Sequence, residues 1–169
     1  MSDIKELIQK KYNNSPFSGN GSVQALIQQG LQVLDQEGSP TVKHEEWKYT
    51  RIAGVLNKEY HYAVQESAIA ANELDALRLP GYEQANELVF INGIYHAELS
   101  TIRSSKDDLV VLPISEAVKG SYKSVIDQHL GHSSNYHQDG INAMNNAFAH
   151  EGLFIAVNKN VQLTHPVYC

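Results

Sequence analysis

Histidines gather between residues 129 and 137, and they are the first side chains whose chemistry has to be weighed. His129 ends an expected helix, and His132 and His137 follow in a loop rich in serine and asparagine. Imidazole is a common ligand of zinc and iron, which raises the hypothesis of a metal site. The spacing opposes it, because no two of these histidines form a helical i,i+4 pair and no carboxylate stands at ligand spacing before Asp139. We expect a solvated loop, with a His-loop metal-binding domain as an alternative.

A second titratable group, His44, Glu45 and Glu46, stands next to Trp47, the single tryptophan of the chain. Adjacent carboxylates point in different directions on a helix or a strand, so they make a poor catalytic pair. We interpret the stretch as a structural clamp. In this interpretation the Trp47 ring is buried, Glu45 or Glu46 accepts its indole N–H, and Lys48 stacks on an aromatic face.

The familiar motifs of enzyme chemistry are missing from the sequence. It contains no phosphate-binding loop, no G-x-S-x-G, no H-E-x-x-H and no Rossmann glycine pattern. Its single cysteine excludes an internal disulfide and a Cys-based metal cage within one chain. A β-solenoid acyltransferase would need hexapeptide repeats, which are absent. We therefore expect no enzyme, with no catalytic, cofactor-binding or metal-binding residue in this chain.

The composition is that of a soluble globular protein, with 42% hydrophobic and 19% charged residues. The formal net charge of −6 does not favour nucleic acid or an anionic membrane as a partner. No apolar run approaches the ~18 residues of a spanning helix, and the N-terminus lacks the features of a signal peptide. We expect a cytoplasmic protein without a nucleic-acid or membrane partner.

Apolar residues at helical spacing recur along the chain, commonly followed by glycine or proline. Helices are expected over 2–12, 22–37, 72–77, 113–120, 121–130 and 139–152. The helix over 22–37 has the strongest apolar stripe, with Ser22 as its N-cap and Gly38 at its end.

The helices over 121–130 and 139–152 each predict a buried face. In the first, the inner positions are Tyr122, Val125, Ile126, His129 and Leu130, and Gly131 is the terminator. In the second, they are Ile141, Met144, Ala147 and Phe148, and Gly152 is the expected left-handed stop.

The clearest strand signal is Asn92-Gly93 between two β-rich runs, because a type I′ turn needs positive φ at both central residues. In that hairpin Phe90 faces Tyr95 and Ile91 neighbours Ile94, and the apolar character of both faces predicts cover on both sides. Further strands are expected over 60–64 and 109–112.

The end of the sequence has the pattern of an unfinished β-solenoid. Two apolar runs, 153–157 and 161–164, flank the turn at 158–160 and suit one rung, whose strands must pair with a next coil. We expect that the chain is a piece of a longer protein, and that these open edges pair with a second copy as a homodimer through residues 153–168.

The expected fold class is α+β, with an N-terminal helical region and a β-hairpin leading into the first rung of a truncated right-handed parallel β-helix. The expected domains are 1–21, an N-terminal helix and flexible linker; 22–150, an α+β domain; and 151–169, the incomplete start of the β-helix core.

Three separated blocks carry a family pattern. The first contains Pro40, Thr41, Glu46, Trp47, Lys48, Tyr49 and Thr50; the second Asn92 and Gly93; the third Asn145, Phe148, Gly152 and Pro166. In this order the blocks resemble the N-terminal portion of the SufB/SufD family of iron–sulfur cluster assembly proteins. The third block departs from the family pattern at Met144, Asn146, Asn158 and Asn160. Asparagine at the glycine position 160 is a mild change, because it tolerates the left-handed conformation.

The first two blocks place the resemblance on the SufD side of the family, with a SufB-like paralogue as the alternative. It implies the N-terminal part of a SufD-like scaffold subunit of the SUF assembly complex, with an interaction role and no chemistry of its own. The implied partners are SufB-like and SufC-like (ATPase) subunits. The iron–sulfur cluster belongs to the complex, and the family's cluster-related residues lie in segments outside this sequence, so the chain itself is expected to hold no cofactor.

Overall fold

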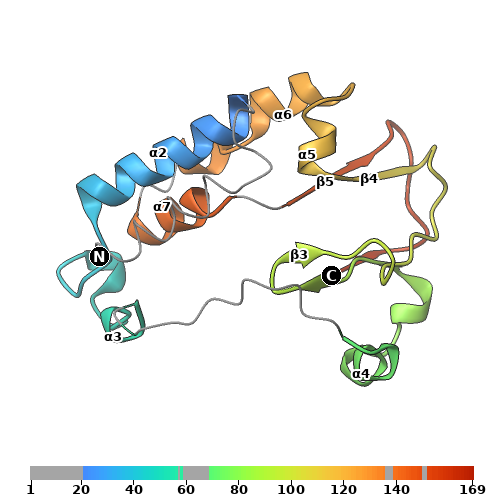
Figure 1. Ribbon diagram of the computed structural model, residues 1–169, viewed down its shortest axis with the longest axis horizontal. Coiled ribbons are helices and arrows are strands. Elements are labelled where there is room, and N and C mark those ends of the chain that lie inside the picture. The colour runs from blue at the N-terminus through green and yellow to red at the C-terminus, as the bar shows by residue number, and fades with distance from the viewer. Residues whose placement is uncertain (1–20, 57, 59–68, 136–138, 150–151) are drawn as a thin grey trace. The chain divides into compact units, whose positions relative to one another are not determined.

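The computed structural model describes residues 21–56, 58, 69–135, 139–149 and 152–169, and its described chain is a mixture of helices and small sheets (Figure 1). Contacts divide it into two compact units. Unit 1 consists of Met1–His61 with Val118–His150, and unit 2 of Tyr62–Ala117 with Glu151–Cys169. The expected helix over 2–12, the strand over 60–64 and His137 lie outside the described residues. The three-part division expected from the sequence stays a prediction.

Unit 1 is helical in its described part. Its elements are α2 (Gly21–Glu37), η1 (Glu45–Trp47), α3 (Ala53–Leu56), α6 (Lys123–His129), η3 (His132–Asn135) and α7 (Gly140–Ala147).

Unit 2 combines short helices and strands. Its elements are α4 (Ala71–Leu77), η2 (Tyr82–Gln84), β1 (Asn86–Glu87), β2 (Phe90–Ile91), β3 (Ile94–Tyr95), β4 (Leu109–Pro113), α5 (Ile114–Ala117), β5 (Leu153–Val157) and β6 (Val167–Tyr168).

Helix α2 agrees with its predicted stripe. The buried positions are Val23, Leu26, Ile27, Gly30 and Leu34, and Leu31 of the stripe is partly buried. The helix ends as expected at Gly38, whose φ is 68° and whose N–H donates to the Leu34 carbonyl at 3.1 Å. The left-handed conformation closes the last turn without a Cβ penalty.

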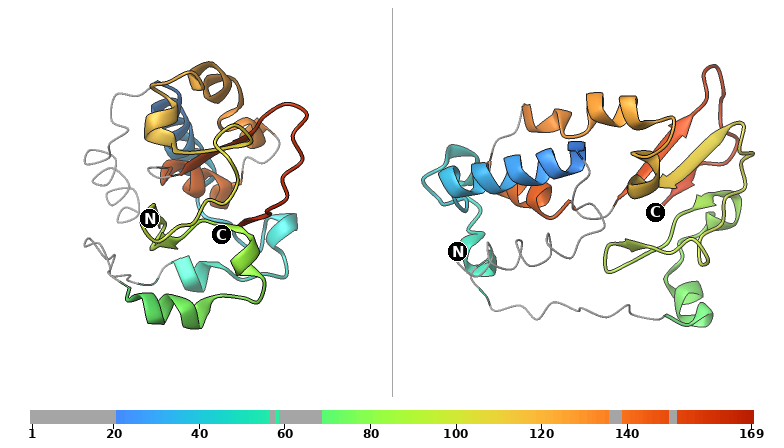
Figure 2. Two further views of the ribbon diagram at one scale, coloured as in Figure 1. Left: turned by 90° about the vertical axis from the view of Figure 1, so that its right-hand side faces the viewer. Right: turned by 45° about the horizontal axis from the view of Figure 1, so that its top comes forward.

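Helices α2 and α7 lie side by side in both Figure 1 and Figure 2, and small residues make this contact possible. A Cβ on Gly30 would stand 2.6 Å from the Ala143 carbonyl oxygen and 2.6 Å from the Ala147 nitrogen. The predicted buried face of α7 is therefore wrong in part: Gly140, Ala143, Asn146 and Ala147 are buried, while Ile141 and Met144 are only partly buried. Backbone proximity favours the small side chains over the largest ones.

Helix α7 begins at the predicted N-terminal end, but its C-terminal end differs from the predicted helix over 139–152. The Asp139 carboxylate caps the N-terminus, accepting from the N–H groups of Ile141 at 2.8 Å and Asn142 at 3.1 Å. The helix ends at Ala147, well before Gly152, which is not among the glycines with positive φ. The expected stop at Gly152 is wrong.

Helix α6 buries one side chain of its predicted inner face. Ile126 is 4% exposed, whereas Val125 is 44% exposed and His129 is also exposed, so these two positions were wrongly assigned to the inner face. Gly131 ends the segment with φ at 75°, as predicted.

The Asn92-Gly93 hairpin has the predicted register, with Phe90 opposite Tyr95 and Ile91 opposite Ile94. Both turn residues have positive φ, 53° and 82°. The two aromatic rings meet at a centroid distance of 5.7 Å. Cover on both faces is not found, because Phe90 remains 38% exposed.

The C-terminal strands pair differently from a solenoid rung. β5 is antiparallel to β4, with Leu109 opposite Val157 and Pro113 opposite Leu153. β6 is parallel to β1, and residues 161–164, which were expected as a strand, have no strand structure. Each of these sheets is two-stranded, so the α+β class is confirmed in outline and a β-helix is not. Asn160 adopts φ of 66°, as its place in the turn predicts.

Among the described residues, no helix is both long and apolar enough to span a bilayer.

Candidate functional site

Residues 40–50, the block that contains Trp47, form a loop after α2. The 3-10 helix η1 (Glu45–Trp47) lies within this loop. Trp47 is half-buried, and its indole Nε1 atom is buried without a hydrogen-bond partner among the described residues. Neither expected acceptor, Glu45 or Glu46, bonds to it. The Glu45 carboxylate lies 3.7 Å from the Lys48 ammonium. The clamp is therefore only partly as predicted.

A cavity of about 230 Å³ adjoins Trp47. Its lining comes from the end of α2, from η1 and from the start of α7: Glu37, Gly38, Pro40, His44, Glu45, Glu46, Trp47, Asp139 and Gly140. The Asp139 carboxylate already accepts two backbone N–H groups of α7. The Nδ1 atom of His44 accepts from the Thr41 N–H at 2.9 Å. Two titratable side chains at this cavity, His44 and Asp139, thus accept hydrogen bonds from backbone N–H groups.

The second half of the block points to solvent. Tyr49 is 90% exposed, and the Lys48 ammonium lies 5.7 Å from the centroid of its ring, which confirms the expected stacking on an aromatic face. Thr50 is exposed, in contrast to the buried Pro40. The block is thus anchored at one end and presented to solvent at the other.

The remaining family-motif residues have backbone or packing roles. Phe148 packs against the buried cluster of Leu34, Ala143 and Ala147, and Asn145 is exposed on α7. The Gly152 carbonyl accepts from Ile114 N–H at 2.9 Å, and the Pro166 carbonyl from Asn86 N–H at 2.7 Å. The blocks are divided between the units: residues 40–50, Asn145 and Phe148 belong to unit 1, and Asn92, Gly93, Gly152 and Pro166 to unit 2.

The two described histidines of the predicted loop, His129 and His132, are exposed. Among the described residues, no three His, Cys, Asp or Glu side chains come together as a metal would require.

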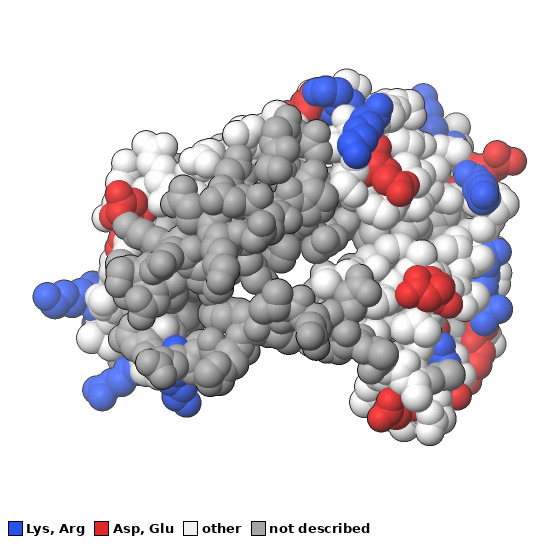
Figure 3. Space-filling model, in the orientation of Figure 1, with Lys and Arg blue, Asp and Glu red and all other residues white. Residues whose placement is uncertain are grey.

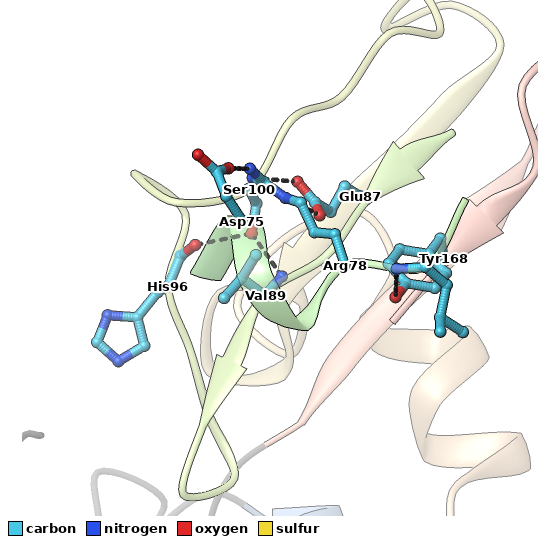
Figure 4. A network of polar contacts seen from close by, with 8 residues as sticks. Asp75, Arg78, Glu87, Val89, His96, Ser100 and Tyr168 are labelled. Carbon is cyan, nitrogen blue, oxygen red and sulfur yellow. Dashed lines mark hydrogen bonds and ion pairs between the residues drawn. The ribbon is translucent and has the colours of Figure 1, made fainter. Parts of the chain in front are cut away.

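Arg78, which follows α4, has several charged and aromatic neighbours among the described residues of unit 2 (Figure 4). Its guanidinium donates two bonds to the Glu87 carboxylate, from Nε at 2.7 Å and from Nη2 at 2.8 Å. It also pairs with Asp75, and it lies 4.7 Å from the centroid of the Tyr82 ring. The hydrogen bonds of Glu87 raise the pKa of Arg78 above its ordinary value, further supported by the charges of Glu87 and Asp75. This fork ties α4 to β1.

Asn86, the other residue of β1, is fully buried and uses its whole amide. The Nδ2 group donates to Ser104 Oγ at 3.0 Å and to the His165 carbonyl at 2.8 Å. The Oδ1 atom accepts from the N–H groups of Arg103 and Ser104, both at 2.9 Å. All donors and acceptors expected of an amide are paired, so Asn86 joins the 103–104 loop to the segment before β6.

A smaller node of the same unit closes the β2–β3 hairpin. Ser100 Oγ donates to the His96 carbonyl at 2.7 Å and accepts from Val89 N–H at 2.8 Å (Figure 4).

The roles of Arg78, Asn86 and Glu87 were not predicted from the sequence. In the sequence, Asn86 and Glu87 are a polar pair directly before the apolar run that begins at Leu88. Polar residues at the start of a strand are usually exposed, and nothing local announces that these are buried. The described polar clusters hold backbone and elements together, and they do not direct a nucleophile and a base at a common point.

Comparisons with known proteins give two positive findings. A family model described as "SufBD protein N-terminal region" matches residues 4–169. The curated iron–sulfur cluster assembly protein SufD of Escherichia coli (strain K12) is 41% identical over 73 residues, which cover 43% of this chain and 16% of that protein. The matched part is thus a small share of the relative's length. No solved structure gives a significant match.

Proposed function

The chain belongs to the SufBD N-terminal-region family, and from this membership we propose that it acts in iron–sulfur cluster assembly as the N-terminal part of a SufD-like scaffold subunit. The observation that carries the proposal is the extent of the match, which runs over residues 4–169. A chance resemblance of one motif would not extend over both units of the molecule.

Assignment to SufD, as opposed to its SufB-like paralogue, is the finer part of the proposal. It is supported by the 41% identity to a SufD protein over 73 residues and by the Trp47 and Asn92-Gly93 blocks. Complementation tests it. The gene that encodes this chain should restore iron–sulfur enzyme activity in a host that lacks its SufD-like subunit and fail in a host that lacks its SufB-like subunit. The reverse pattern would assign the chain to SufB, and failure in both hosts would refute the proposed role.

We further propose that the chain has an interaction role and no chemistry of its own. Support comes from how the described polar groups are used: Arg78, Asn86 and Asp139 are engaged in holding helices, strands and loops. Elemental analysis after anaerobic purification should then find no stoichiometric iron or zinc. Bound zinc that is lost on substitution of His129 and His132 would favour the His-loop alternative.

As partners we propose SufB-like and SufC-like (ATPase) subunits, reached through a right-handed parallel β-helix that follows the described strands. The parallel pairing of β1 with β6 is compatible with this arrangement.

We propose the cytoplasm as the compartment, where the exposed thiol of Cys169 stays reduced. Co-purification of the natural full-length protein from the cytosolic fraction, with both subunits bound, is the expected result.

A homodimer through residues 153–168 is proposed in a revised form. β4 already pairs with one edge of β5, so the proposed second copy pairs with the other edge. Ile155 and Val157 of this strand are exposed. Light scattering should give a dimer mass for the unmodified chain and a monomer mass for Ile155→Lys. Val125→Lys is the matched control, since Val125 on α6 is 44% exposed and Ile155 is 42% exposed. A monomer mass for the unmodified chain would refute the dimer.

A further inference from the structure

The loop between α2 and α3 presents apolar and cationic side chains together on the surface. Val42 is 49% exposed, Tyr49 is 90% exposed and Val55 in α3 is 53% exposed. Lys43, Lys48 and Arg51 are exposed between them. We call this set of six residues the loop surface. None of its large side chains belongs to the buried core, so packing does not explain their character.

A cavity of about 460 Å³ adjoins the loop surface, and Val42 and Arg51 belong to both. It is lined by Pro40, Thr41, Val42, Thr50, Arg51, Ile52 and Gly54. The atoms that this lining exposes to the cavity are mostly apolar, and Arg51 is the charged residue among the lining residues. A mostly apolar cavity of this size with one fixed charge is suited to an apolar side chain flanked by an anion.

Residues 42–55 carry three cations against the two exposed carboxylates of Glu45 and Glu46, a formal charge of +1, whereas the formal net charge of the chain is −6. Lys48 is engaged by Glu45 and by the Tyr49 ring, but no described carboxylate pairs with Lys43 or Arg51. Figure 3 shows cationic side chains at the lower left, where Figure 1 places α3 and the loop before it. Two cations are therefore available to an external anion.

The ordinary explanation is that this is a solvated loop, as single exposed apolar residues are common. Three observations oppose it. The exposed residues fall within one short stretch, 42–55, and two of them, Val42 and Arg51, line the cavity. The set also includes tyrosine and arginine, which are enriched among the residues that dominate binding energy at protein interfaces. Lys48 over the Tyr49 ring also restricts an aromatic side chain that solvent would leave free.

We propose that the loop surface docks an acidic peptide segment of a partner protein. An apolar side chain of the segment enters the cavity beside Val42, and a neighbouring carboxylate pairs with the Arg51 guanidinium, which offers a fork of donors. Lys43 adds long-range attraction, and Tyr49 covers the docked segment. This surface is independent of the proposed role in cluster assembly, so its test can fail while that role holds.

The test is fluorescence anisotropy with the whole chain and labelled peptides. The probe is a short peptide of alternating aspartate and leucine, compared with serine–leucine, aspartate–serine and lysine–leucine peptides of equal length and with a single-stranded oligonucleotide. The aspartate–leucine peptide should bind at least about ten-fold more tightly than each of the others, and added salt should weaken it.

Variants of exposed residues locate the binding. Arg51→Glu and Val42→Asp should each weaken the aspartate–leucine peptide at least about ten-fold, and Tyr49→Ala should raise its dissociation rate. Arg103→Glu is the matched control, since Arg103 is an exposed arginine of unit 2, outside the loop surface. Circular dichroism verifies that each variant is folded.

Three results would overturn the proposal. They are absence of binding by the aspartate–leucine peptide, equal binding of the serine–leucine peptide or the oligonucleotide, and equal loss of affinity in Arg51→Glu and Arg103→Glu.

Discussion

At the scale of single residues, two buried polar groups of this molecule are treated in opposite ways. Every donor and acceptor of the Asn86 amide is bonded, whereas the Trp47 indole N–H has no partner among the described residues. A buried group without a partner loses its hydration and gains nothing in return, while a fully bonded amide stabilises the segments it joins. The two residues therefore respond differently to substitution.

Trp47→Phe should be better tolerated than Trp47→Ala. Phenylalanine keeps most of the apolar contact and removes the unbonded N–H, so the free energy of unfolding should stay within about 1 kcal/mol of the unmodified chain. Alanine loses the ring, at a cost approaching the ~3–5 kcal/mol of a buried aromatic, reduced by the half-exposure of Trp47. Urea denaturation measures both, with the exposed Tyr49→Ala as the unchanged control. A greater loss in Phe than in Ala would contradict the stated role of the N–H.

Asn86→Ala should destabilise the chain by at least about 2 kcal/mol, because it leaves two backbone N–H groups and a carbonyl without their bonds. Asn145→Ala is the comparison, since Asn145 is exposed on a helix and alanine suits helices better. Chemical denaturation of the two variants should separate them clearly. Equal midpoints would mean that the Asn86 bonds are replaced by water at no cost.

At the scale of elements, helix contacts in unit 1 depend on a position without a side chain as well as on side-chain hydrogen bonds. The absence of a side chain at Gly30 lets the backbones of α2 and α7 meet. A polar tie complements it: the Ser22 hydroxyl at the start of α2 donates to the Asp127 carboxylate of α6, which also pairs with Lys123. Both contacts are testable through α2.

Gly30→Ala should destabilise the chain by about 1–3 kcal/mol, although alanine is the better helix former. Its Cβ would stand 2.6 Å from two backbone atoms of α7, so the helices must separate. Gly21→Ala in the same helix has open space around it and should be neutral or slightly stabilising. Thermal midpoints of the two variants provide the measurement, and a stabilised Gly30→Ala variant would show that α7 is free to shift.

The stability that Asp127 contributes should depend on pH. The hydrogen bond from Lys123, together with that from Ser22, lowers the pKa of Asp127 in the folded chain. A lowered folded pKa means that the contribution is present above the unfolded pKa and is lost as the pH falls through the folded value. The unmodified chain should therefore exceed Asp127→Asn in stability near neutral pH, and the gap should close below about pH 4. A gap that persists in acid or is insensitive to salt would exclude this charge effect.

At the scale of the whole molecule, the chain visits each unit more than once. Residues 118–150 return to unit 1 and residues 151–169 return to unit 2. Each unit has buried residues of its own, such as Ile27 and Ala143 in the first and Leu88 and Leu109 in the second. Regions with separate cores open locally at separate free energies.

Hydrogen exchange should resolve this organisation. Gly30→Ala should speed amide exchange in α2 and α7 more than in residues 85–104, and Asn86→Ala should do the opposite. Mass spectrometry of peptic fragments at matched conditions provides the comparison. A uniform acceleration across both units in either variant would show that they unfold as one cooperative body.

The sequence by itself determined the elements whose causes are local. The α2 stripe follows from a 3.6-residue period, and the Asn92-Gly93 hairpin and the stop at Gly38 follow from residues that accept positive φ. The family could also be recognised from the sequence. The blocks at Pro40–Thr50 and Asn92-Gly93 are short contiguous motifs, so their residue types and spacing can be read without knowledge of the fold.

Only the tertiary structure decided which segments of the chain contact one another. The run at 153–157 has the pattern of a strand in any pairing, and its antiparallel contact with β4 depends on residues 109–113, which are distant in the sequence. The small-residue face of α7 is set by Gly30 on another helix, and the burial of Asn86 by the loop and tail that bond to it. A strand's own pattern specifies which groups need hydrogen bonds but not which distant segment supplies them, and hydrophobicity does not reveal where two backbones approach.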